Sequence, residues 1–185
     1  MTNLKTTLLL AFVVSFTFSC SEKTSNQQEE TQEMNDSEST AAKETMPAAS
    51  VSFSNQETTA IINSYLDLKD QLVATDGEKA SAAAKSLLSV LENSETKTKE
   101  SMKTAVQQIA DSTDPEIQRT AFDLVSQQIL IVAKREVLTE GKLYKQYCPM
   151  AKNNTGAFWL SSSEDIRNPY FGDKMLKCGS VEEEI

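Results

Sequence analysis

The chain has 185 residues with 27 acidic and 18 basic side chains, a formal net charge of -9 and no histidine. After subtraction of a targeting segment and a tether, this length leaves material for one domain. Nucleic-acid binding requires a clustered basic surface, whereas the Lys and Arg residues here are scattered among more numerous acids, so we expect no nucleic-acid partner. Histidine is the usual general base and the commonest zinc ligand, so its absence leads us to expect no enzymatic activity.

The first 19 residues have the layout of a bacterial signal peptide. One positive charge at Lys5 precedes an apolar run from Leu8 to Phe18, which covers only about half of a bilayer core roughly 30 Å thick and is too short to span it. The stretch that ends in Ser19-Cys20 resembles a relaxed lipobox, in which Cys20 accepts diacylglycerol. The sequence predicts a signal peptide at 1–19 and lipidation of Cys20; the alternative is an ordinary secretory signal with an unmodified Cys20.

Buried acyl chains hold a protein on a membrane. We therefore expect an outer-membrane lipoprotein that faces the periplasm, although the sequence leaves the choice of leaflet open. Residues 20–52 are expected to form the lipid anchor and a disordered acidic tether, because the segment has no aromatic residue and too few apolar ones to bury a core. An acidic segment that collects cations is the alternative interpretation.

Residues 53–185 are predicted to form a helical domain. Ser54 and Glu57 match a capping box at the start of a first helix. Asp114-Pro115 combines an N-cap residue with proline at the first helical position and predicts the start of a fourth helix. Apolar residues recur at helical spacing in four stretches: 61–73, 80–91, 102–109 and 117–137. The last is apolar over more of its girth than the others and is expected to be the central helix.

Short connections between helices make neighbours antiparallel, so the predicted fold is all-α, an up-down four-helix bundle. The tail that follows Gly141 is rich in aromatic residues and in Pro and Gly turn signals. We expect it to be irregular and to bury its aromatic side chains against the bundle rather than to form a ligand cage. These are Tyr144, Tyr147, Phe158, Trp159, Tyr170 and Phe171.

Four phrases of this tail carry a family resemblance: Tyr147-Cys148-Pro149-Met150, Trp159-Leu160-Ser161, Ile166 to Gly172 and Met175 to Gly179. Together with Tyr65 to Asp70 and Gln118-Arg119, they resemble the Bacteroidota domain of unknown function 3347. That family occurs as stand-alone lipoproteins and fused to periplasmic adaptor subunits of heavy-metal efflux pumps of the resistance-nodulation-division type. The resemblance implies an efflux adaptor or pump as partner, but no mechanism. The metal-binding segments of such adaptors continue with His after Cys-Pro-Met, where this chain has Ala151.

The four sulfur atoms of the tail allow two interpretations. Cys148, Met150, Met175 and Cys178 are predicted ligands of a soft metal ion such as Cu(I), since thiolates and thioethers select Cu(I) over hard ions. Zinc is less favoured because thioethers bind it poorly and no His completes the site. Alternatively, Cys148 and Cys178 form a disulfide, as cysteines in an oxidising compartment usually do, or remain two buried free thiols.

Two functions follow from these alternatives. The first is a metal-binding accessory to heavy-metal efflux or homeostasis. The second is a protein-interaction module without metal, stapled by a Cys148-Cys178 disulfide, which docks a pump component through the loop from Asn168 to Gly172. A thiol oxidoreductase is disfavoured because the two cysteines are 30 residues apart in sequence and no His can activate them.

Overall fold

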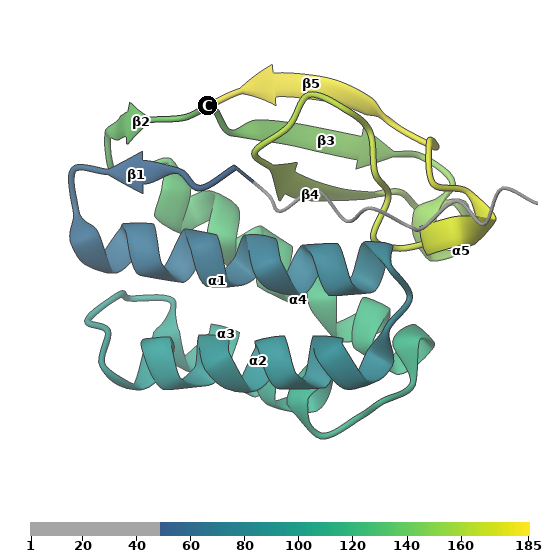
Figure 1. Cartoon of the computed structure of the whole chain (residues 1–185), viewed down its shortest axis with the longest axis horizontal. Coiled ribbons are helices and arrows are strands. Elements are labelled where there is room, and N and C mark those ends of the chain that lie inside the picture. The colour runs from purple at the N-terminus through teal and green to yellow at the C-terminus, as the bar shows by residue number, and fades with distance from the viewer. Residues whose placement is uncertain (1–48) are drawn as a thin grey trace, which may run out of the picture. The chain divides into compact units, whose positions relative to one another are not determined.

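The computed structural model of the chain describes residues 49–185. Four consecutive helices come first: α1 (Gln56–Val73), α2 (Gly77–Glu92), α3 (Lys99–Ala110) and α4 (Pro115–Ala133). Each helix packs against the next, and α4 returns onto α1. In Figure 1, α1 and α4 form one layer, and α2 and α3 form a second layer below it. The four predicted helices are therefore present.

Local signals decide where these helices begin. Asp76 and Asp114 act as N-caps of α2 and α4, with side chains that accept hydrogen bonds from the N–H groups of Lys79 and Glu116. The predicted capping box at Ser54 is wrong by one residue, because Asn55 is the N-cap of α1 and accepts from the N–H of Thr58.

Both residues of the predicted box have other partners. The Ser54 hydroxyl donates to Glu136, and the Glu57 carboxylate accepts from the N–H of Glu95. Each therefore bridges to a distant segment instead of closing the first helical turn.

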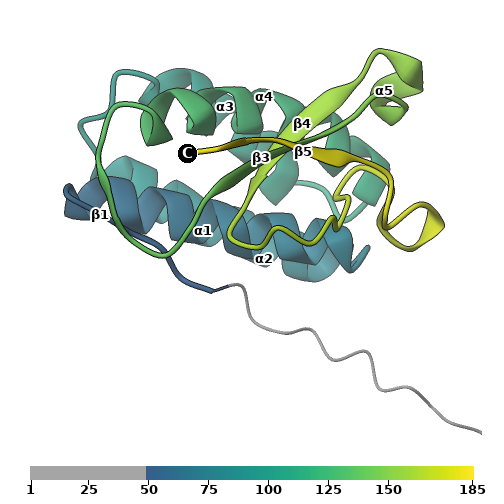
Figure 2. The ribbon, with the colours of Figure 1, turned by 90° about the horizontal axis from the view of Figure 1, so that it is seen from above.

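The chain after α4 forms two small antiparallel sheets. The first pairs β1 (Ser52–Phe53) with β2 (Leu138–Glu140). The second has the strand order β4-β3-β5. Its strands are β3 (Tyr144–Cys148), β4 (Ala157–Ser161) and β5 (Ser180–Glu184), with the short helix α5 (Ala151–Asn154) between β3 and β4 and the 3-10 helix η1 (Gly172–Lys174) before β5. Seen from above, the three strands run obliquely across α1 and α4 (Figure 2).

The predicted fold class is correct only in its coarser part. The described chain is mainly helical, but the C-terminal part contains two small sheets where an irregular segment was expected. The domain therefore has three layers, a sheet over α1 and α4 and these over α2 and α3 (Figure 1), and the predicted four-helix bundle is not confirmed. No helix within residues 49–185 is both long and apolar enough to cross a membrane.

Aromatic residues join the sheet to the helices. The rings of Tyr65 on α1 and Phe122 on α4 stack with centroids 5.2 Å apart, and Tyr170 packs against Phe122 at 5.8 Å. Trp159 on β4 meets Tyr170 edge-on at 6.2 Å and is fully buried. Such pairs add specific ring contacts to their burial. The expectation that tail aromatics are core is confirmed for Tyr144, Trp159 and Tyr170, whereas Tyr147, Phe158 and Phe171 are half-buried.

Candidate functional site

A disulfide joins Cys148 and Cys178, whose Cα atoms are 5.8 Å apart. Cys148 is the last residue of β3 and fully buried, while Cys178 lies just before β5, the strand that pairs with β3. The bridge closes a loop between residues separated by 30 positions, a length for which cross-linking stabilises a domain by roughly 3 to 4 kcal/mol. The sequence left three states open for these two cysteines: metal ligands, a disulfide or free thiols. The structure contains the disulfide.

The two predicted thioether ligands lie near this bridge but do not complete a metal site. Met150 is 48% exposed in the turn after β3. Met175 is half-buried, and its carbonyl oxygen accepts the N–H of Cys178 at 3.0 Å. Because both cysteine sulfurs are bonded to each other, neither is a thiolate. Within residues 49–185 no group of three or more Cys, Asp or Glu side chains is arranged to hold a metal ion.

The chain between β3 and β4 contains a left-handed turn. Lys152, Asn153 and Asn154 have φ angles of 53°, 56° and 65°, and Gly156 follows at 82°. Left-handed conformations at consecutive residues other than Gly are costly and persist where the surroundings hold them. Here the N–H of Gly156 donates to the carbonyl of Ala151 at 3.0 Å, and an ion pair between Lys152 and Asp123 ties the turn to α4.

The loop from Asn168 to Gly172 is held from inside by Asn168, which is fully buried. Its side-chain amide donates to the carbonyl of Cys178 at 2.8 Å, and its side-chain oxygen accepts the N–H of Tyr170 at 2.8 Å. The Tyr170 hydroxyl donates to the carbonyl of Phe158 at 2.9 Å. Burial raises the pKa of Tyr170 well above its ordinary value, with a smaller contribution from nearby Tyr65, so the phenol stays protonated as a donor.

Arg119 fixes the position of this loop against the helices. Its Nε donates to the carbonyl of Pro169 at 2.8 Å, and one terminal nitrogen donates to the carbonyl of Leu72 at 3.2 Å and to the Thr75 hydroxyl at 3.0 Å. The other terminal nitrogen pairs with Glu116 at 2.9 Å. Gly172 is the last residue of this loop, with φ of 54°, and a Cβ there would lie 2.1 Å from the Thr75 hydroxyl oxygen. The loop therefore packs on the helices without space for a larger residue.

The left-handed turn, the Asn168 loop and the start of α4 enclose one pocket of about 260 Å³, here called the motif pocket. Three basic side chains face one acidic side chain in its lining. Lys174 is exposed and lies 3.8 Å from the Glu116 carboxylate, and Phe171 is half-buried at the rim. The lining residues are Glu116, Arg119, Thr120, Lys152, Asn153, Tyr170, Phe171 and Lys174.

Sequence reasoning did not find the motif pocket as a unit. The Gln118-Arg119 phrase and the Asn168 loop were singled out separately, but Lys152, Asn153 and Lys174 were not. Only the return of the chain across α4 brings these segments together. The run Lys152-Asn153-Asn154 ahead of Gly156 carried the available signal, since Asn tolerates left-handed conformations better than most residues.

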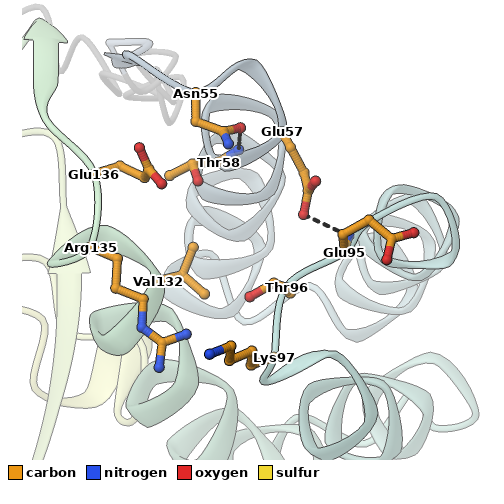
Figure 3. Close-up of a pocket in the computed structure, with 9 residues that line it drawn as sticks. All are labelled: Asn55, Glu57, Thr58, Glu95, Thr96, Lys97, Val132, Arg135 and Glu136. Carbon is orange, nitrogen blue, oxygen red and sulfur yellow. Dashed lines mark hydrogen bonds between the residues drawn. The ribbon is translucent and has the colours of Figure 1, made fainter.

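A second pocket, of about 220 Å³, lies at the other end of α4 and α1. Its lining is polar and mixes acidic and basic groups (Figure 3). The Arg135 guanidinium and the Lys97 ammonium point into the same space, while Glu57 is engaged with the N–H of Glu95 at 2.9 Å. Neither Arg135 nor Lys97 forms an ion pair with another residue of the described part of the chain. Cys20, the predicted lipidation site, lies outside the described residues.

Comparison with known proteins gives one match. The model of a family described as a protein of unknown function (DUF3347) matches residues 61–140, which run from the first turns of α1 to the end of β2. No curated protein and no solved structure matches the chain. The four tail phrases lie beyond the matched range. The resemblance expected from the sequence motifs is confirmed: over its helices, this chain is similar to the DUF3347 family.

Proposed function

We propose that this chain is an exported lipoprotein whose domain is a non-catalytic interaction module, stapled by a disulfide, that docks a component of a heavy-metal efflux system. The observation that carries the proposal is the convergence of the Arg119, Lys152 and Asn168 segments on the motif pocket. A buried Arg and a disulfide immobilise this surface. Rigid preorganised surfaces lose little entropy on binding, which suits a docking site.

The rim of the motif pocket indicates the chemistry of the docked segment. Lys174 is largely exposed, with 77% of its side chain accessible. Its partner Glu116 is shared with Arg119, so Lys174 can exchange a weak surface pair for an acidic group of the partner. The half-buried Phe171 lies in the same lining. We expect a partner segment that presents a carboxylate next to an apolar side chain.

Tyr170 does not belong to the docking surface, although its loop does. It is 6% exposed and packed against Phe122 and Trp159, so replacing it would damage the core and could not separate docking from folding. Phe171 and Lys174 are the residues to change.

Docking is tested with the full chain and a purified periplasmic adaptor subunit of a resistance-nodulation-division heavy-metal pump, with and without a chelator. Phe171→Ala and Lys174→Glu are expected to weaken binding, and the chelator is expected to have no effect. Lys103→Glu on α3, away from the motif pocket, is the matched control. Equal binding by all variants would show that the motif pocket is not the docking site.

Export and lipidation of Cys20 agree with the disulfide, because structural disulfides belong to oxidising compartments. Cys20→Ser is expected to shift the chain from the membrane fraction to the soluble periplasmic fraction. Intact mass of the wild-type chain should show acylation at Cys20, and an unacylated chain that remains soluble would contradict this part of the proposal.

Binding of Cu(I) is the second candidate. It is favoured by the position of Met150 and Met175, each within three residues of a disulfide cysteine. This function requires a thiol reductant to open the bridge and supply two thiolates. The test is a count of free thiols in the chain purified from an oxidising periplasm, followed by Cu(I) titration after reduction.

One tightly bound Cu(I), lost in Cys148→Ser and in Cys178→Ser, would support a redox-dependent metal accessory. Cys20→Ser serves as the control for thiols outside the bridge. A stoichiometric disulfide that resists mild reductant, with no Cu(I) uptake above that of a chain lacking Cys148 and Cys178, would exclude this candidate.

A further inference from the structure

The outer face of α4 carries an apolar stripe that the fold leaves uncovered. Ile117, Leu124 and Ile131 are 54%, 40% and 40% exposed. They are seven residues apart, so they lie two helical turns apart on one face with a drift of only about 20° per step. The helix was expected to be the central one; it packs against α1, α3 and β4, but this face stays uncovered. The three side chains form a narrow apolar strip on an otherwise polar face, along which a second helix can pack.

We propose that this face pairs with the same face of a second copy of the chain, with the two α4 helices antiparallel. The stripe is symmetric about Leu124, because Ile117 and Ile131 lie seven residues to either side of it. A two-fold axis through Leu124 therefore places Leu124 against Leu124 of the second copy, and each Ile117 against the other copy's Ile131. Such a self-complementary patch is what a two-fold interface requires.

The charges at the two ends of the stripe are complementary in the same arrangement. Asp111 and Asp114 lie just before the N-terminus of α4, whereas Arg135 lies just past its C-terminal end. Glu116 and Lys134, at the same two ends, are already paired with Arg119 and Glu183 of their own chain. Antiparallel pairing sets acidic ends against basic ends twice, and parallel pairing would set acid against acid. Arg135 has no ion pair with a described residue and lies close to Lys97 (Figure 3), so an acidic side chain of a second copy would give it a charged partner.

A shallow depression of about 470 Å³ lies beside Ile117, between the end of α3 and the start of α4. Its lining includes Asp111, Ser112 and Thr120. In the antiparallel pair, Ile131 of the second copy meets this depression, and Arg135, one turn further along, meets Asp111. The two-fold axis repeats both contacts. Each copy therefore supplies a depression and also the side chains that occupy the depression of the other copy. A single helix face makes a small interface, and the dimer is therefore expected to be reversible.

The pairing is tested by cross-linking the full chain with a short bis-maleimide, with wild type as the baseline for its own cysteines. Leu124→Cys is expected to give dimers several-fold above wild type, because the axis places the two thiols together. Ser86→Cys, exposed on α2, is the matched control and should stay at the baseline. A Leu124→Cys yield equal to that of Ser86→Cys would overturn the proposal.

Register and charge are tested separately. A mixture of Ile117→Cys and Ile131→Cys chains should cross-link more than either chain alone, whereas efficient cross-linking of Ile117→Cys with itself would mean a parallel pair and contradict the proposal. Arg135→Glu should lower the Leu124→Cys dimer yield by roughly tenfold, because like charges across an interface disfavour association. Adding Asp111→Lys should restore the yield; failure to restore it would show that the two residues do not meet.

Discussion

Arg119 joins three parts of the chain that are far apart in sequence. Its guanidinium connects the end of α1, the start of α4 and the loop at Pro169, and its side chain is 5% exposed. A buried charge is tolerated when its donors are satisfied, and removing it leaves buried carbonyl groups without partners. This one side chain thus determines whether the motif pocket keeps its shape.

Replacement of Arg119 by Met keeps much of the apolar stem and removes the donors. We expect a loss of about 3 kcal/mol in the free energy of unfolding, because the carbonyls of Pro169 and Leu72 lose their donor. Glu116→Ala is the matched control, since Glu116 is 68% exposed and a surface pair contributes less than about 1 kcal/mol. Denaturant titration measures both, and equal losses would show that Arg119 acts mainly through Glu116.

Buried tyrosines make stability sensitive to alkaline pH. Burial raises the pKa of Tyr65 far above its ordinary value, against smaller opposing effects of its hydrogen bonds with the Ser126 hydroxyl and with the N–H of Leu160. The unfolded chain ionises this phenol near its ordinary pKa of about 10, while the folded chain does not. The stabilisation is complete below pH 10 and is lost as pH rises above it.

We therefore expect the free energy of unfolding to fall steadily above about pH 10. Tyr65→Phe should lower stability at neutral pH by about 1 kcal/mol through the lost hydrogen bonds and should make the alkaline decline shallower. Urea titrations at several pH values measure this, with half-buried Tyr147→Phe as the control. A decline of equal steepness in Tyr65→Phe would mean that other groups cause it.

At the scale of elements, α2 begins where two backbone segments touch. Gly77 is its first residue, and a Cβ there would lie 1.9 Å from the carbonyl oxygen of Thr113, in the connection between α3 and α4. The Gln118 side chain also donates to the carbonyl of Gly77 at 2.8 Å. Close approach of two backbones, rather than a special φ angle, is what requires glycine here.

Gly77→Ala is expected to destabilise the domain by about 2 kcal/mol, because overpacking against backbone outweighs the gain in helix propensity. Ala82→Gly in the same helix is the matched control. Ala82 is exposed, so that change should cost about 1 kcal/mol by propensity alone. Thermal or chemical unfolding measures the stability of both variants. A stabilised Gly77→Ala would show that the connection between α3 and α4 shifts to make room for the added methyl group.

The helices could be predicted and the strands could not, for a physical reason visible in β3. Its burial alternates, with Tyr144, Gln146 and Cys148 inside, but the central inward residue is polar. Gln146 accepts the Trp159 indole N–H at 2.7 Å and donates to the carbonyl of Ser163 at 2.9 Å. A buried glutamine satisfied by distant partners removes the apolar alternation by which a strand is predicted.

The other strands and the site add further examples. All five residues of β5 are exposed, so hydrophobic pattern gives no signal for that strand. The N-cap at Asp114 is a local signal and was predicted from the sequence, as was the possibility of the Cys148–Cys178 bridge. The motif pocket depends on contacts between residues about 50 positions apart, such as Arg119 with Pro169, which no local pattern encodes.

At the scale of the whole molecule, the helices depend on the sheet that covers them. Tyr65 and Phe122 in the helical layer pack against Tyr170, and the hydroxyl of Tyr65 accepts from the N–H of Leu160 on β4 at 3.1 Å. The matched family range ends at residue 140, before these partners. The family range is therefore shorter than the folding unit.

A chain that ends at Gly141 is expected to retain helix but to lose cooperative unfolding, because the apolar faces of α1 and α4 would be exposed to water. A chain that begins at Ala49 and keeps the tail is the matched control and should unfold cooperatively. Circular dichroism during thermal unfolding and binding of a hydrophobic dye distinguish the two. A sharp transition in the truncated chain would show that the helices form an independent unit.

The sheet ends in an edge strand, β5, that hydrogen-bonds on one side only to β3. Glu182, Glu183 and Glu184 stand along it, each paired with a lysine of the same chain. Open strand edges readily recruit strands from other molecules, and charged side chains prevent this. The row of charged side chains on β5 therefore makes it unfavourable for crowded copies of the protein to join edge to edge at this strand into a continuous intermolecular sheet.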